Sequence, residues 1–187
     1  DLRGALASAE RASALTAGRS DSVALAAGLV HGHALVHLGE SRRGRALYEP
    51  ILEALEREGA TWHWSHVGTL VPGQQLAWLE EFDRARALLE RVVAAARAGG
   101  APGLLPYPVA CLSELWFRVG AWTRAYAGAE EAVTLARETG QEAVAAFALC
   151  CLARVEAATQ NAAGSAGRAD ALLVAFAARR AVDRGVA

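Results

Sequence analysis

The sequence contains no lysine and no methionine, one isoleucine, and only 6% aromatic residues. Without lysine it holds no Walker A phosphate loop, no Schiff-base lysine and no kinase-type catalytic lysine. All 19 basic residues are therefore arginine, and 20 acidic residues balance them to a net charge of −1. The two signs are interspersed without a basic stripe, so we expect no direct contact with nucleic acid. Because residue 1 is not methionine, we expect the chain to be a segment of a longer protein.

Long apolar runs are also missing, and cysteine is scarce. The longest uncharged stretch, residues 59–79, contains histidine, glutamine and proline, so we expect no membrane span. The 3 cysteines form no CxxC pair, which is typical of reduced thiols in a cytoplasmic protein. Alanine, in contrast, supplies 45 of the 187 residues. Because alanine and leucine favour helices, this composition predicts an all-α protein and argues against an all-β one.

The chain repeats itself with a period of about 40 residues. Segments that begin at His31, Pro72, Leu112 and Leu152 align with successive offsets of 41, 40 and 40 residues. Two columns of this alignment hold only small residues: Gly32, Gly73, Ser113 and Ala153 in the first, and Gly44, Ala85, Ala125 and Ser165 twelve residues later. Small residues allow two helix backbones to approach closely, so we interpret each column pair as a contact within an antiparallel helical hairpin. The turn between the two helices then falls at residues 39–40, 80–81, 120–121 and 160–161.

Helix start and stop signals place two helices in each repeat. The predicted first helices are Asp21–Leu38, Trp62–Leu79, Pro106–Val119 and Gln141–Thr159. The predicted second helices are Ser41–Glu58, Asp83–Ala98, Thr123–Glu138 and Ser165–Arg184. Pro72 falls inside a predicted helix, so we expect either a kink or a late helix start there.

The second helices are amphipathic and need stacked neighbours to bury their apolar faces. We therefore predict an α-α superhelix of antiparallel helix pairs, right-handed and solenoid-like. It forms one helical-repeat domain over residues 1–187, with a half repeat at 1–20 and repeats at 21–60, 61–100, 101–140 and 141–187.

These helix pairs resemble tetratricopeptide repeats, although the period here is longer. The longer form is similar to the repeat region of the large ATP-binding LuxR-family (MalT-like) transcriptional regulators. The stretch Leu104–Gln141 is the most similar, with its Arg118, Gly120 and Trp122 turn and its ARETGQ ending. The resemblance implies a regulatory segment that carries neither the ATPase domain nor the helix-turn-helix of such regulators.

The resemblance also implies that the first helix of each pair lines a concave groove that binds peptides or small effectors. One residue after the first small column, the chain places His33, Gln74, Glu114 and Arg154. Four residues further along it places His37, Trp78 and Arg118. We interpret these two stripes as a candidate ligand-binding groove, with Trp78 as an apolar anchor and the arginines as partners for a carboxylate or phosphate. The alternative is that they only form ion pairs between helices, such as Glu114 with Arg154.

Other chemistry-bearing residues favour structural interpretations. His33 with His37, and His63 with His66, lack the third and fourth ligands that zinc needs, so we expect no metal and no cofactor. The segment around Ser165 resembles a nucleophile elbow but lies between predicted helices rather than after a strand. Cys111, Cys150 and Cys151 are interpreted as buried small hydrophobic residues. Trp62 and Trp64 suit a binding surface, a core or a contact with another domain equally well.

Together these patterns predict a non-enzymatic regulatory or protein-interaction module that binds a peptide or small-molecule effector in the cytoplasm. The alternative in the same class is a scaffold that forms homo-oligomers through its ends. The alternative in another class is a helical enzyme, for which the sequence offers no clustered acids and no metal triad.

Overall fold

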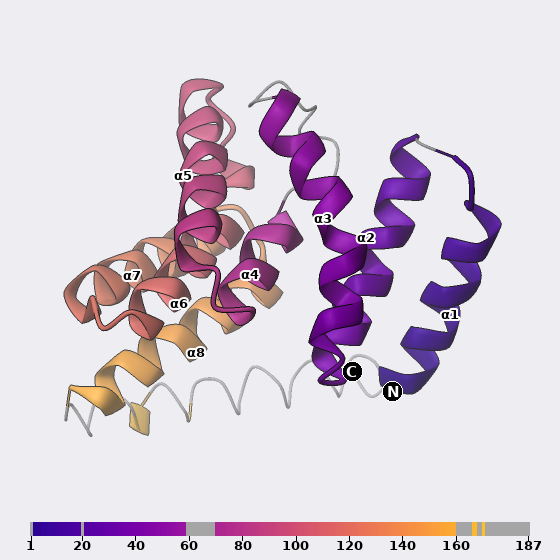
Figure 1. The fold of residues 1–187 in the computed structure, drawn as a ribbon. Helices are drawn as coiled ribbons and strands as arrows, with labels where there is room; N and C mark the ends of the chain where they lie inside the picture. The colour runs from indigo at the N-terminus through magenta and orange to yellow at the C-terminus, as the bar shows by residue number, and fades with distance from the viewer. Residues whose placement is uncertain (1, 20, 59–69, 160–165, 168–169, 171–187) are drawn as a thin grey trace, which may run out of the picture. The chain divides into compact units, whose positions relative to one another are not determined.

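The computed structural model describes residues 2–19, 21–58, 70–159, 166–167 and 170 (Figure 1). Every regular element within these residues is a helix, and none of them is a strand, which confirms the predicted all-α class. The chain divides into two compact units, Asp1–Val92 and Val93–Ala187, and each is described here by itself.

Unit 1 is built from α1 (Leu2–Leu15), α2 (Ser22–His37), α3 (Ser41–Glu58), α4 (Leu70–Trp78) and the first part of α5 (Phe82–Ala98). Helix α2 packs against α1 on one side and α3 on the other, and it also contacts α4 (Figure 1). The first helices of two successive predicted repeats, α2 and α4, therefore lie next to each other.

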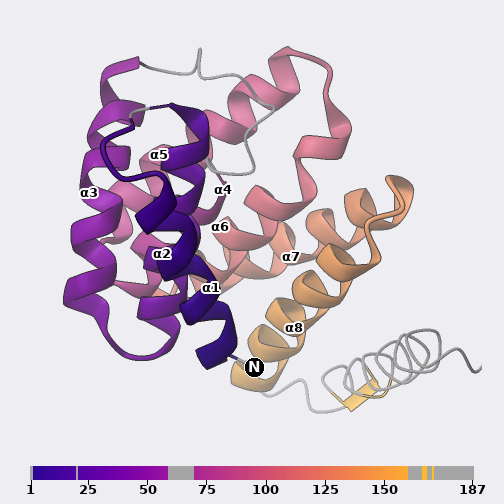
Figure 2. The same cartoon turned by 90° about the vertical axis from the view of Figure 1, so that its right-hand side faces the viewer.

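Unit 2 contains the end of α5, a short 3-10 turn at Pro102–Leu104, α6 (Pro106–Arg118), α7 (Trp122–Glu138) and α8 (Glu142–Ala158). Helix α7 packs against both α6 and α8, and α6 also contacts α8 (Figure 2). Small and medium apolar side chains fill the core between them: Val93, Ala96, Leu105, Val109, Ala110, Ala132, Val133, Ala148 and Leu149. The many alanines thus give close helix packing as well as helix propensity.

The described helices follow the predicted boundaries closely. Helix α3 coincides with its prediction, and the ends of α2, α5, α6, α7 and α8 differ from theirs by one residue at most. Helix α4 is described over Leu70–Trp78 and contains Pro72, and the predicted start of this helix lies outside the described residues. Residues 62–69 of that predicted helix and the predicted helix Ser165–Arg184 lie outside the described parts of the chain, apart from a few residues of the latter.

The three described turns inside the predicted hairpins share one geometry. Their central residues have positive φ angles, 82° at Gly39, 64° at Glu80 and 78° at Gly120. The next residue donates its backbone N–H to the carbonyl five residues back, as Glu40 does to Leu35 at 2.9 Å. This is the Schellman arrangement that ends many helices. The predicted turns at 39–40, 80–81 and 120–121 are confirmed, whereas 160–161 lies outside the described residues.

The small columns mark the predicted helix contacts. A Cβ atom added at Gly44 would lie 2.9 Å from the carbonyl oxygen of Gly32, so α2 and α3 touch through their backbones. In unit 2, the Ser113 hydroxyl donates a 2.6 Å hydrogen bond to the carbonyl oxygen of Ala125. The contact predicted between Ala153 and Ser165 involves a residue that is not described.

Candidate functional site

In unit 1 the predicted groove residues of α2 and α4 form an aromatic cluster. His33 and His37 are one helical turn apart, and their ring centroids lie 4.4 Å from each other. The Trp78 ring lies edge-on to His37 at 4.5 Å and within 6.1 Å of His33. Three of the four groove residues predicted for this unit are therefore brought together across two helices.

The side chain that pairs with His33 belongs to Gln75, the residue after the predicted groove residue Gln74. The Gln75 side-chain amide donates a 2.6 Å hydrogen bond to Nδ1 of His33. Gln75 is completely buried, and Gln74 is buried as well. Sequence reasoning overlooked Gln75, although the alignment carried a signal. Its column otherwise holds Ala34, Leu115 and Val155, which are all buried and apolar, so a glutamine there is conspicuous.

The environment of His33 favours its neutral form. Burial lowers the pKa of His33 below its ordinary value of 6.5, and the nearby His37 lowers it further. Protonation at Nδ1 would also remove the lone pair that accepts the hydrogen bond from Gln75. The hydrogen bond from Gln75 to His33, which joins α4 to α2, is therefore favoured when His33 carries no charge.

We expect unit 1 to lose stability as the pH falls below about 6.5, because the unfolded chain then binds a proton on His33 that the folded chain resists. The stabilisation is complete above the unfolded pKa and is lost as the pH falls toward the lowered folded pKa. Urea unfolding at pH 7.5 and pH 5.5 measures this loss, which should be smaller in His33→Gln. Equal pH dependence in the two proteins would contradict the expectation.

In unit 2 the predicted residues of α6 and α8 form a charged cluster. Glu114 is buried, and its Oε1 accepts from Arg118 Nη2 at 3.1 Å and from Arg154 Nη1 at 3.5 Å. The interpretation of Glu114 and Arg154 as an ion pair between helices is thus confirmed. The guanidinium of Arg154 also lies over the Phe117 ring, 4.6 Å from its centroid.

Both arginines nevertheless remain accessible. The side chain of Arg118 is 32% exposed and that of Arg154 is 45% exposed, against 5% for Glu114. Each guanidinium carries five N–H donors, and Glu114 Oε1 accepts only a few of them. The cluster therefore presents two positive groups, one on each helix, that a buried carboxylate holds near each other.

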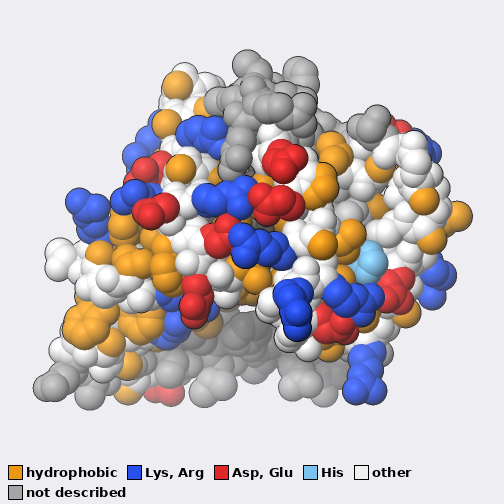
Figure 3. All heavy atoms as spheres, in the orientation of Figure 1, with side chains coloured by type: hydrophobic (Ala, Val, Ile, Leu, Met, Phe, Trp, Pro, Cys, Tyr) orange, Lys and Arg blue, Asp and Glu red, His pale blue; other side chains and the backbone are white. Residues whose placement is uncertain are grey.

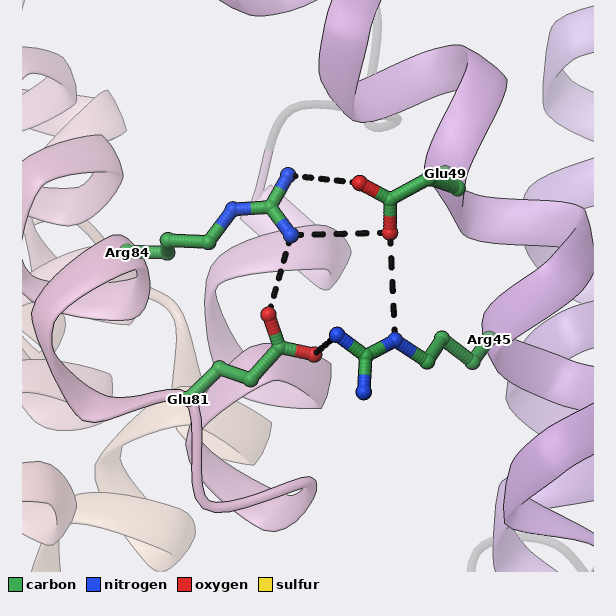
Figure 4. Close-up of polar contacts among 4 residues, drawn as sticks. All are labelled: Arg45, Glu49, Glu81 and Arg84. Atoms are coloured by element: carbon green, nitrogen blue, oxygen red, sulfur yellow. Dashed lines mark hydrogen bonds and ion pairs between the residues drawn. The ribbon is translucent and has the colours of Figure 1, made fainter.

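A second charged cluster, which the sequence analysis did not identify, joins α3 to the start of α5 (Figure 4). Arg84 Nη2 lies 3.0 Å from Glu49, and its Nη1 lies 2.9 Å from Glu81. Arg45 closes the ring, with 2.9 Å to Glu81 and 3.9 Å to Glu49. Figure 3, drawn in the orientation of Figure 1, shows acidic and basic side chains gathered in the middle of the view. A sequence signal existed, because Glu81 and Arg84 repeat the spacing of the ion pair between Glu40 and Arg43.

The described cysteines are poor nucleophiles. Cys111 and Cys151 are buried, as predicted, whereas Cys150 is half-buried. Burial raises the pKa of the Cys111 thiol and raises that of Cys151 to about 12, and nearby Glu114 acts in the same direction. At neutral pH these groups stay protonated, and a thiol in that state neither attacks substrates nor binds metal well.

Several predicted features cannot be compared with the structure. His63, His66, Trp62, Trp64 and Ser165 lie outside the described residues. Among the residues that are described, no three or more histidine, cysteine or acidic side chains gather as a metal site would require. The described helices also include none that is long and apolar enough to cross a membrane.

Comparison of this chain with models of known protein families finds no match, and comparison with curated proteins finds none either.

Proposed function

We propose that this chain is a non-enzymatic, ligand-binding regulatory segment that acts in the cytoplasm. Its sequence resembles the tetratricopeptide-like repeat region of large ATP-binding LuxR-family regulators, chiefly over Leu104–Gln141. The recurring hairpin turns and small-residue contacts support a repeat architecture. In this proposal successive helix pairs stack into a superhelix, and the ligand lies along the first helices of the pairs.

One observation carries the proposal: two accessible arginines from different helices are fixed on a single buried glutamate. Arg118 and Arg154 both contact Glu114 Oε1, which holds their side chains in place before any ligand arrives. Arginines fixed in this way suit a ligand carboxylate, because less side-chain entropy is lost on binding. The excess of one positive charge in the cluster favours an anionic ligand.

The regulatory step follows from the same geometry. A ligand carboxylate that binds Arg118 and Arg154 competes with Glu114 for their N–H donors. Because the two arginines belong to α6 and α8, such competition changes the balance of contacts between these helices. A ligand shifts a conformational equilibrium only if it binds one state more tightly than the other. The exchange of ion pairs would give the ligand different affinities for two arrangements of α6 and α8.

Binding of a fluorescent acidic peptide of alternating aspartate and leucine, followed by anisotropy, tests the proposal. Arg118→Gln and Arg154→Gln should each weaken binding about tenfold, as expected for the loss of a charge-assisted hydrogen bond. Arg124→Gln is the matched control, because Arg124 is also an arginine of unit 2 but lies over Trp116 on another helix. Absence of binding, or equal affinity in all three variants, would reject the proposed site.

A second candidate function is a scaffold that self-associates. It is favoured by apolar side chains exposed on the first two helices: Leu15 is 83% exposed, Val30 58% and Val23 56%. Light scattering over a concentration series tests it, and Val23→Ser with Val30→Ser should keep the protein monomeric if this surface mediates association. A concentration-independent monomer before any substitution would reject the scaffold function.

A further inference from the structure

Unit 1 contains a pocket on helices α3, α4 and α5. Its volume is about 400 Å³, within the range of about 300–1,000 Å³ that is usual for small-molecule sites. It is lined by Leu52 of α3, Leu76 of α4 and five residues of α5: Asp83, Arg84, Ala87, Leu88 and Arg91. None of the seven predicted groove residues is among them, so this is a separate site.

One face of α5 forms much of the pocket. Arg84, Ala87, Leu88 and Arg91 follow the three- and four-residue spacing that places side chains on the same side of a helix. The middle of this face offers only the short side chain of Ala87 and the apolar side chain of Leu88. The apolar part of the lining therefore combines Ala87, which is exposed, with Leu52, Leu76 and Leu88, which are buried.

The charged side chains at the two ends of this face differ in whether they are already held in ion pairs. Arg84 is held by Glu49 and Glu81 in the ion-pair ring of Figure 4. Asp83 binds Arg86 at 3.1 Å. Arg91 lies seven residues beyond Arg84, about 10 Å along the helix, and forms no ion pair with the described side chains. A guanidinium with available donors beside an apolar pocket is well suited to a carboxylate.

We infer that this pocket binds a small amphiphile with one anionic group, whose apolar part lies on Leu52, Leu76 and Leu88 and whose carboxylate pairs with Arg91. Among the charged lining residues, Arg84 and Asp83 are each paired with an opposite charge, so the available charge is that of Arg91, which favours an anion over a cation. The ion-pair ring occupies Arg84, which leaves Arg91 as the group that orients the ligand. Apolar burial supplies affinity, and the single cation supplies specificity.

Octanoate, octanol and octylamine are matched probes, because they share an apolar chain and differ in charge. Isothermal titration calorimetry on the whole chain should show octanoate binding more tightly than octanol, and octylamine binding least. Arg91→Gln should weaken octanoate binding about tenfold and leave octanol binding unchanged. Ala87→Phe, which fills the pocket from an exposed position, should weaken both by tenfold or more.

The control is Arg42→Gln, which removes an exposed arginine of α3 that is not part of the lining. It should bind octanoate as the unaltered protein does, and circular dichroism should show equal helix content in all variants. NMR shifts at the amides of Ala87 and Leu88 would locate the ligand. The inference is overturned if octanoate does not bind at millimolar concentration, if octylamine binds as tightly, or if both pocket variants bind octanoate normally.

Discussion

Replacing Gly44 by alanine is expected to lower the free energy of unfolding by about 2 kcal/mol. A Cβ atom at this position would lie 2.6 Å from Cγ2 of Val36 and 2.9 Å from the backbone oxygen of Gly32. Because a helix backbone moves only with the whole helix, α2 and α3 must separate, and such overpacking costs about 3 kcal/mol. The gain in helix propensity from glycine to alanine is about 1 kcal/mol and does not offset this cost.

Gly28→Ala is the matched control, because Gly28 also lies within the α2–α3 pair. Its added Cβ would meet only Cδ1 of Ile51, at 3.5 Å, which is an ordinary van der Waals contact. Helix propensity should then decide the result, and the free energy of unfolding should rise by up to about 1 kcal/mol. Urea unfolding measures both variants. If Gly44→Ala were as stable as Gly28→Ala, the small columns would not mark tight helix contacts.

The sequence allowed the hairpins to be predicted because their signals are local. A glycine with positive φ, such as Gly39 or Gly120, ends one helix, and small residues seven positions before the turn and four positions after it face each other. Both features depend on spacing within about 20 residues of the chain, which the alignment measured directly. Glu80 adopts the same turn without being glycine, so the repeat spacing located this turn better than residue type did.

The site could be predicted only in part, because its contacts depend on distances between helices. His33 and His37 were placed together by helical periodicity alone. Gln74 was the predicted groove residue, whereas its neighbour Gln75 pairs with His33, because a one-residue step turns a side chain by about 100° around the helix. The pairing of Arg45 with Glu81 joins α3 to the residue before α5, and no local pattern fixes how far apart these segments lie.

Removing both cations from Glu114 is expected to destabilise unit 2 by about 2–3 kcal/mol. In the variant Arg118→Met/Arg154→Met the apolar stems are largely kept, but the buried carboxylate loses two ion pairs. Breaking a fully buried pair costs about 3–5 kcal/mol. The arginines are 32% and 45% exposed, so solvent already screens part of the attraction and the loss should be smaller. Urea unfolding at neutral pH measures the change.

A third substitution separates the effect of charge from the effect of packing. Adding Glu114→Leu to the double methionine variant removes the buried carboxylate itself, so most of the lost stability should return. Glu114→Leu alone should be less well tolerated than in that background, because the two arginines would then repel each other without their shared acceptor. If the triple variant is no more stable than the double variant, Glu114 is not stabilised by these arginines. They would then be free to bind other partners, and the fixed arrangement proposed for ligand recognition would be wrong.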